Sequence, residues 1–97
     1  MLPLHSKLTV IGAGPGGYTA AIYASRAGLE PILLEGLIPG GPLRVSYGVD
    51  NFPGYSQGIQ RPELKEEMRK QAKGFGTIIM ESKAEKIDLL NRPFTIE

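Results

Sequence analysis

Six consecutive residues near the start of the chain have the types and spacing needed to bind phosphate groups. They are Gly12-Ala-Gly-Pro-Gly-Gly17, which follow the apolar run Leu8-Thr-Val-Ile11 and precede a segment typical of a helix, residues 18–27. Gly12 permits a turn that a side chain would strain, Gly14 lets backbone approach a ligand, and Gly17 lets the helix pack tightly on the strand. Because the first N–H groups of a helix lack partners and carry partial positive charge, this pattern predicts a site for the pyrophosphate of a dinucleotide.

An acidic residue at the end of the next predicted strand supports a nucleotide site. Pro31-Ile-Leu-Leu-Glu35 ends in a carboxylate. In dinucleotide-binding folds an acid about 20 residues after the glycine turn accepts a hydrogen bond from a ribose hydroxyl. We therefore predict that Glu35 holds a ribose hydroxyl. The alternative is a glycine turn that has only a structural role.

Composition excludes several other classes of function. The 97 residues carry 11 Lys and Arg against 10 Asp and Glu, a net charge of +1, so nothing indicates binding to nucleic acid or to an anionic membrane. No apolar run approaches the length of a membrane span, and residues 1–7 lack the features of a signal peptide, which favours a cytoplasmic location. The chain has no cysteine, which excludes disulfides, thiolate metal sites and thiol redox chemistry within it.

The hydrophobic pattern predicts an α/β fold in which a parallel sheet is followed by a small antiparallel pair. We expect a helix at 15–27 and another at 62–74, with a loop at 36–60 between the second strand and the second helix. The chain stops inside a predicted strand, which indicates a piece of a larger domain. The strands are expected at residues 7–11, 31–35, 77–80, 83–89 and 93–97.

The long loop has features of a ligand site. Backbone at Gly40-Gly41 can approach a flat ring without interference from a side chain. Asn51 offers a donor and an acceptor to the edge of a heterocycle, and Phe52-Pro-Gly54 predicts a turn directly after it. The alternative is a mobile surface loop, but a solvated loop rarely carries three aromatic residues, here Tyr47, Phe52 and Tyr55.

These motifs together resemble the N-terminal part of the FAD domain of low-molecular-weight thioredoxin reductases. The matching stretch Val49-Asp-Asn-Phe-Pro-Gly54 contains the most specific element, Asn51-Phe-Pro-Gly54, which flavin reductase subunits of alkyl hydroperoxide reductase share. The resemblance covers nearly the whole chain and implies a Rossmann-like, three-layer FAD-binding fold of which residues 1–97 form an incomplete, N-terminal portion. The other matching segments are Val10–Gly28, Leu34–Gly36, Gly40-Gly41 with Leu43, Gly58-Ile59, Pro62–Leu64, Phe75-Gly76, Ile87–Leu89 and Arg92–Phe94.

The resemblance also implies a role for individual residues. The glycine turn would line the FAD pyrophosphate, Glu35 and Gly36 would lie at the adenosine ribose, and backbone at Lys83 or Ala84 would contact the adenine. Gly40, Gly41 and Leu43 would run beside the isoalloxazine ring, and Asn51 would reach it. The residues implied at the pyrophosphate are Gly12, Ala13, Gly14, Pro15 and Gly16.

In the complete family members a hydride passes from NADPH to FAD, and two electrons then pass through a Cys-x-x-Cys pair to the disulfide of a thioredoxin. The resemblance therefore implies the remainder of the reductase, a thioredoxin-like protein and a homodimeric assembly as partners. Without an NADPH domain or cysteines, the 97 residues alone are expected to be inactive.

Two departures from the family pattern lie in the loop. Pro42 stands where the family usually has glutamine, and Arg44–Gly48 replaces a threonine-rich run, with Tyr47 available to cover part of the flavin. Two alternatives stay open: a ferredoxin-dependent or ferredoxin–NADP reductase relative on the same scaffold, which needs no cysteine pair, and a nucleotide-binding remnant without catalysis.

Overall fold

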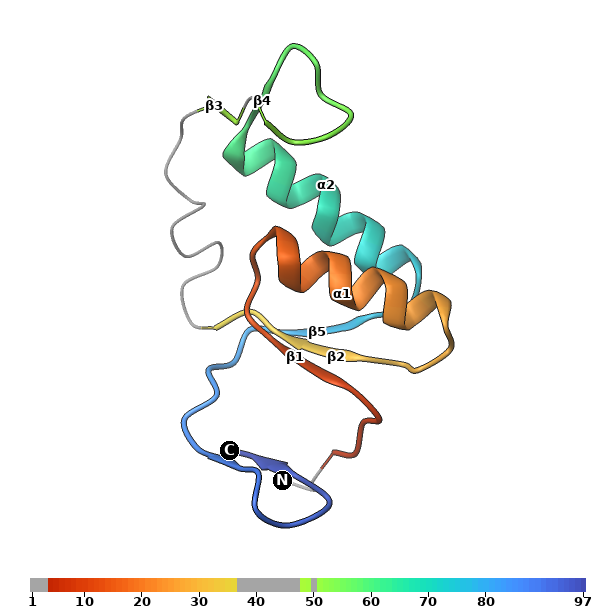
Figure 1. Ribbon diagram of the computed structural model, residues 1–97, viewed down its shortest axis with the longest axis vertical. Helices are drawn as coiled ribbons and strands as arrows, with labels where there is room; N and C mark the ends of the chain where they lie inside the picture. The colour runs from red at the N-terminus through yellow and green to blue at the C-terminus, as the bar shows by residue number, and fades with distance from the viewer. Residues whose placement is uncertain (1–3, 37–47, 50) are drawn as a thin grey trace.

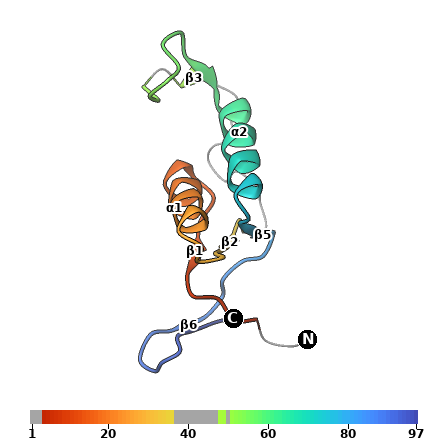
Figure 2. The same cartoon turned by 90° about the vertical axis from the view of Figure 1, so that its right-hand side faces the viewer.

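The computed structural model describes residues 4–36, 48–49 and 51–97. Within these residues the elements lie in layers, which Figure 2 shows edge-on: helices α1 and α2, then a parallel sheet, then a short antiparallel hairpin on the other side of the sheet. This arrangement confirms the predicted α/β class with a parallel sheet and a small antiparallel pair.

The parallel sheet has the strand order β1-β2-β5 (Figure 1). Leu33 lies at its centre, paired with Val10 on one side and Ile79 on the other, and is fully buried. Each strand is shorter than its predicted range. The strands are β1 (Thr9–Ile11), β2 (Ile32–Leu34) and β5 (Ile78–Met80).

Helix α1 (Pro15–Arg26) forms where it is predicted, because both of its ends carry suitable residues. Pro15 occupies the first turn, where its fixed backbone angle suits a helix and its missing N–H costs nothing. At the other end Gly28 adopts a φ of +77°. The N–H of Gly28 donates to the Ser25 carbonyl at 3.0 Å and that of Leu29 to the Ala24 carbonyl at 3.1 Å, the Schellman arrangement that ends many helices.

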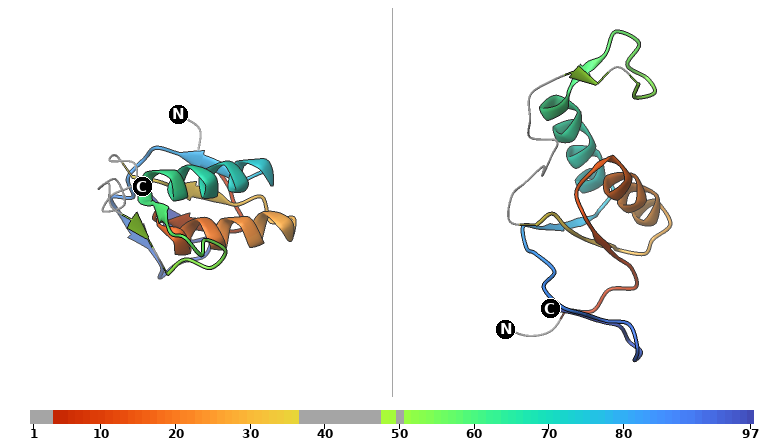
Figure 3. Two further views of the ribbon diagram at one scale, coloured as in Figure 1. Left: turned by 90° about the horizontal axis from the view of Figure 1, so that it is seen from above. Right: turned by 60° about the vertical axis from the view of Figure 1, so that its left-hand side comes forward.

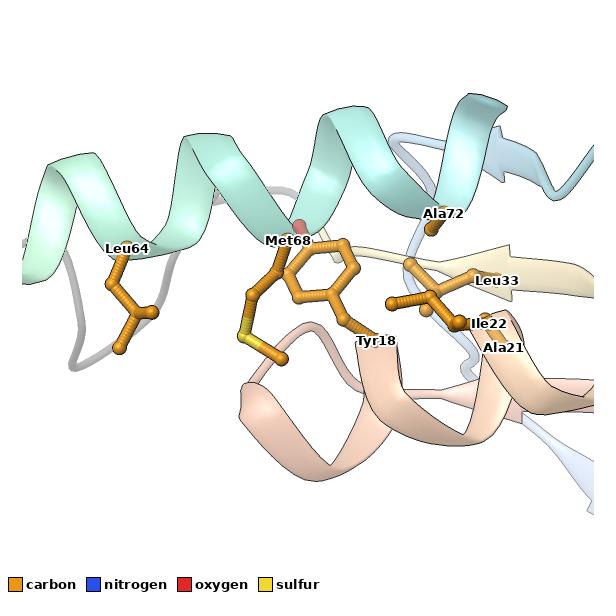
Figure 4. Close-up of a cluster of buried hydrophobic side chains, with 7 residues drawn as sticks. All are labelled: Tyr18, Ala21, Ile22, Leu33, Leu64, Met68 and Ala72. Carbon is orange, nitrogen blue, oxygen red and sulfur yellow. The ribbon is translucent and has the colours of Figure 1, made fainter. Parts of the chain in front are cut away.

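Helix α2 (Arg61–Gly74) begins with Pro62 and Glu63 in its first turn, as predicted. Its buried stripe is Leu64, Met68 and Ala72, which are 2%, 7% and 0% exposed. Figure 4 shows this stripe facing Tyr18, which reaches from α1 toward Met68. The core cluster that results joins both helices to β2; its members are Tyr18, Ala21, Ile22, Leu33, Leu64, Met68 and Ala72.

Both helices cover the same face of the sheet. Seen from above, they lie side by side and begin at the same end of the molecule (Figure 3, left). In a parallel sheet with helical connections this is the end at which the strands finish, where such folds bind ligands. Neither helix in the described ranges is long and apolar enough to cross a membrane.

Two local features differ from the predictions. The predicted loop 36–60 contains a short antiparallel pair, β3 (Gly48–Val49) with β4 (Ile59–Gln60). The predicted strand 77–80 was expected to be buried, but Ile78 is 52% exposed. The reason is that β5 is an edge strand and neither helix covers the face on which Ile78 lies.

The predicted antiparallel pair at the end of the chain is confirmed. β6 (Ile87–Asp88) pairs with β7 (Thr95–Ile96), so that Ile87 lies opposite Ile96. A cavity of about 480 Å³ lies between this hairpin and β1. Its apolar lining residues are Ile11, Ile87, Leu89, Pro93, Phe94 and Ile96.

Candidate dinucleotide-binding site

Backbone hydrogen bonds bring the ends of the three parallel strands together. The N–H of Gly12 donates to the Leu34 carbonyl at 3.0 Å, that of Glu35 to the Met80 carbonyl at 2.9 Å, and that of Gly36 to the Ser82 carbonyl at 3.1 Å. The glycine turn therefore lies beside Glu35-Gly36, which lies beside the segment that leads to Lys83 and Ala84. Three separate stretches of sequence thus meet at the edge of the sheet where the carboxyl ends of its strands lie.

Gly12 and Gly17, at the two ends of the turn, are held as glycine by the structure. Gly12 adopts a φ of +120°, which a residue with a side chain rarely adopts. A Cβ on Gly17 would lie 2.0 Å from the carbonyl oxygen of Gly12. Because backbone fills this space, only glycine allows α1 to lie so close to the turn.

The N-terminus of α1 has the features of an anion site. Gly14 is the N-cap residue, no side chain caps the helix, and the first turn carries no acidic residue. A Cβ built on Gly14 or Gly16 meets nothing within 4 Å among the described atoms. The side-chain positions at Gly14 and Gly16 are thus open as far as the described residues show, and with the uncapped N-terminus of α1 these residues fit a diphosphate.

The side chain of Glu35 lies among polar side chains of both helices. Its side chain is 1% exposed and accepts hydrogen bonds from Tyr18 Oη at 2.5 Å and Arg69 Nε at 3.0 Å. Lys65 Nζ lies 3.5 Å from the same carboxylate oxygen and donates to Tyr18 Oη at 2.8 Å. We call these four side chains, Glu35, Tyr18, Lys65 and Arg69, the Glu35 cluster.

The cluster shifts the protonation of its members. Burial alone raises the pKa of Glu35, but hydrogen bonds from Tyr18 and Arg69 and the charge of Lys65 outweigh it, so that the pKa lies below its ordinary value of 4.5. Burial, with the hydrogen bond to Glu35, raises the pKa of Tyr18. The carboxylate is therefore ionised and the phenol stays a donor at neutral pH.

The other predicted site residues fall into three groups. Exposed Lys83 and half-buried Ala84 follow Ser82, on the other side of Glu35-Gly36 from the glycine turn. Asn51 is exposed on the segment that leads to α2, which lies beyond the N-terminal end of that helix and away from the sheet (Figures 1 and 2). The described residues do not bring Asn51 together with the glycine turn. Gly40, Gly41 and Leu43, like Pro42 and Tyr47, lie outside the described residues.

The prediction from sequence missed the partners of Glu35. Lys65 and Arg69 are spaced i, i+4 on α2, each directly after a member of the buried stripe, so that their stems lie at its border. Two cations at such positions can reach a carboxylate that lies beneath the helix, and this spacing is what a search for partners of Glu35 could have used. Tyr18, at 0% exposure directly after the glycine turn, is the other group that such a search would find.

Comparison with known proteins identifies the family. Residues 6–97 match the family described as pyridine nucleotide-disulphide oxidoreductase, and the chain belongs to this family. The resemblance to thioredoxin reductases is also confirmed. The thioredoxin reductase of Rickettsia bellii is 46% identical over 95 residues, which are 98% of this chain and 31% of the relative. That of Pneumocystis carinii is 47% identical over 96 residues, covering 94% and 30%.

The fold agrees with this assignment. A solved thioredoxin reductase from Giardia duodenalis superposes with a TM-score of 0.88 at 35% identity, over 97% of this chain and 30% of that one. The chain thus spans less than a third of the length of the relatives that it matches.

Proposed function

We propose that the edge of the sheet formed by the glycine turn, Glu35-Gly36 and Lys83-Ala84 binds the adenosine diphosphate half of FAD, as part of a thioredoxin-reductase-like flavoenzyme. The observation that carries this proposal is the open, uncapped N-terminus of α1 beside Gly14 and Gly16, in a chain whose relatives are thioredoxin reductases. Backbone N–H groups at a helix N-terminus favour a diphosphate through their partial positive charge.

Each part of the edge has one proposed task. The pyrophosphate lies against Gly12, Ala13, Gly14, Pro15 and Gly16. Backbone at Glu35-Gly36 lies beside the adenosine ribose, and backbone at Lys83 or Ala84 beside the adenine. FAD supplies the redox chemistry when bound, while this segment binds and orients it. Contacts from Gly40, Gly41, Leu43 and Asn51 to the isoalloxazine ring stay predictions.

For the whole protein we propose the activity of its relatives: two electrons from NADPH would pass by way of the flavin to a disulfide, and the dithiol so formed would reduce the disulfide of a thioredoxin-like partner and return to the disulfide. Because this chain has no cysteine, the redox disulfide belongs to the remainder of the reductase. The homodimer and the cytoplasmic location are part of the same proposal. No observation favours the ferredoxin-linked alternative.

Titration of FAD with the 97-residue chain, followed by quenching of flavin fluorescence, tests the proposal. Saturable quenching that ADP reverses is expected. Gly14→Val places a branched side chain where the diphosphate would lie, and it should abolish quenching because it blocks that approach. Gly74→Val is the matched control, since a Cβ at Gly74 also meets nothing within 4 Å and α2 ends there, far from the turn.

The outcomes are distinct. Quenching in the parent chain and in Gly74→Val, but not in Gly14→Val, supports the proposed site. Equal quenching in all three chains would place the phosphates elsewhere. A folded parent chain that shows no quenching would overturn the proposal that these residues hold the cofactor by themselves.

A further inference from the structure

The carboxylate of Glu35 is enclosed by side chains from both helices. Its Oε2 accepts from Tyr18 on α1 at 2.5 Å and from Arg69 on α2 at 3.0 Å, with Lys65 of α2 at 3.5 Å. Its Oε1 faces Nη2 of Arg69 at 3.5 Å. Both oxygens are thus directed toward the helix layer.

A ribose ligand needs a different placement. To accept a hydrogen bond from a ribose hydroxyl, a carboxylate must present an oxygen at the surface of the site. The side chain of Glu35 is 1% exposed, whereas Lys65 and Arg69, which cover it, are 13% and 26% exposed. Releasing the carboxylate toward a ribose would leave two cations and a buried phenol without their acceptor, which is costly.

We infer that Glu35 is a positioning residue, whose carboxylate holds α2 against the first turns of α1 and the end of β2, and that it does not bind the adenosine ribose. This inference rests on the proposed function, since it concerns the ribose of the same cofactor. The backbone of Glu35 and Gly36 is tied to Met80 and Ser82, so the side chain anchors the stretch that lies beside the ribose.

The structure indicates how this anchor reaches the phosphate site. Tyr18 lies one turn after Gly14, and its N–H donates to the Gly14 carbonyl at 3.1 Å. Its hydroxyl is held by Glu35 and Lys65. A change at Glu35 therefore disturbs the N-terminus of α1 through Tyr18, and the edge of the sheet through its own backbone.

Binding of ADP, 2′-deoxy-ADP and 3′-deoxy-ADP to the parent chain and to Glu35→Gln tests the inference, at a temperature where both chains are folded. Glu35→Gln should weaken all three nucleotides by the same factor, so that the ratios between them stay within about twofold of the parent values. Glu67→Gln, which removes an exposed carboxylate from α2, should change nothing.

A direct role at the ribose gives the opposite pattern. If the parent chain prefers ADP over a deoxy form by more than about tenfold, as a hydrogen bond to a charged group implies, and Glu35→Gln removes this preference, the inference is overturned. A parent chain that binds no nucleotide overturns the proposed function instead, and the ribose part of the inference falls with it.

The anchoring role has a second test that needs no nucleotide. Glu35→Gln and Arg69→Gln should each lower the melting temperature, and the double variant should lower it by less than the sum, while Arg69→Lys restores part of the loss. Additive effects of the two changes would contradict the anchor.

A final control separates anchoring from general loss of stability. Thr77→Val removes the bond of 2.7 Å between Thr77 Oγ1 and Ser25 Oγ, at the other end of α1. It should lower the melting temperature and leave the affinity for ADP unchanged. Equal weakening of ADP binding by Thr77→Val and Glu35→Gln would reduce Glu35 to an ordinary stabilising residue and overturn the inference.

Discussion

Among single residues, Glu35 has partners that its position in the sequence did not predict. An acid at the end of a second strand indicates a ribose ligand, but the same position also lies under any helix that covers the strand. The groups that the carboxylate contacts depend on the side chains that this helix presents to it, and here these are Lys65 and Arg69. Sequence spacing alone could not choose between the two, because the helix comes after a long loop whose path decides which of its residues lie above Glu35.

The buried carboxylate predicts a dependence of stability on pH. The pKa of Glu35 is lower in the folded protein than its ordinary value of 4.5, so its contribution to stability is fully present above pH 4.5. That contribution is lost as the pH falls through the folded value. Urea unfolding of the parent chain and of Glu35→Gln, measured from pH 7 downward, should show their difference in unfolding free energy shrinking below pH 4.5.

The comparison with Glu35→Gln is needed because another group titrates in the same range. The backbone N–H of Leu90 and the side chain of Asn91 lower the pKa of Asp88, which is exposed. Asp88 contributes equally to both chains and cancels in the difference. A difference that stays constant to low pH would show that Glu35 is not ionised within the cluster.

At the scale of elements, the close approach of α1 to the turn after β1 requires glycine at position 17. A glycine at position 17 was predicted to let the helix pack closely on the strand; the structure shows the closest approach at the turn that ends the strand, where a Cβ would lie 2.0 Å from the Gly12 carbonyl oxygen. A clash with backbone cannot be relieved by rotating a side chain. The helix must shift, and the turn must shift with it.

We expect Gly17→Ala to lower the unfolding free energy by about 1–3 kcal/mol, the usual cost of overpacking. Gly16→Ala is the control, because a Cβ there meets nothing within 4 Å, and it should be neutral or stabilise by up to about 1 kcal/mol through helix propensity. Denaturant unfolding of the nucleotide-free chains measures both. Similar stabilities for the two variants would contradict the close contact.

The helices, the parallel strands and the pair β6–β7 could be predicted from sequence, and the pair β3–β4 could not. Both helices and the three parallel strands follow from periodicity and from end signals such as Pro15, Gly28 and Pro62, which act locally. The pair β3–β4 has two residues in each strand, joins positions in a segment rich in glycine and proline, and has no alternating pattern to reveal it. The exposure of Ile78 could not be predicted either, because it depends on which strand lies at the edge of the sheet.

For the molecule as a whole, the cofactor is expected to act on stability. A ligand that binds only the folded chain adds about 2.7 kcal/mol at a hundredfold excess over its Kd. Thermal melts of the 97-residue chain with increasing FAD should therefore show a melting temperature that rises with concentration. Riboflavin, which lacks the adenosine diphosphate half, is the control and should give no shift.

An unchanged melting temperature at saturating FAD would contradict binding to the folded form. A shift with riboflavin equal to that with FAD would show that the flavin ring, and not the adenosine diphosphate half, is what the chain binds. The comparison of FAD with riboflavin thus shows which half of the cofactor the chain binds.

The candidate site was predictable to the extent that it consists of backbone. The meeting of the glycine turn, Glu35-Gly36 and Lys83-Ala84 at one edge follows from the strand order, since parallel strands place their carboxyl ends together. The side chains that complete it, Tyr18, Lys65 and Arg69, depend on how two helices pack. That packing is a tertiary property, and the sequence indicates it only through the i, i+4 spacing of Lys65 and Arg69 beside the buried stripe.

The four glycines of the turn also differ in what keeps them as glycine. Gly12, through its positive φ, and Gly17, through the carbonyl beside it, are constrained by the fold itself, whereas a Cβ on Gly14 or Gly16 meets nothing within 4 Å among the described residues, so that a bound ligand would be what constrains these two. In a lineage that kept the fold and lost the nucleotide, mutations would accumulate at positions 14 and 16 while positions 12 and 17 stayed glycine. The motif therefore combines glycines that the fold requires with glycines that a bound ligand requires. This chain has glycine at all of these positions.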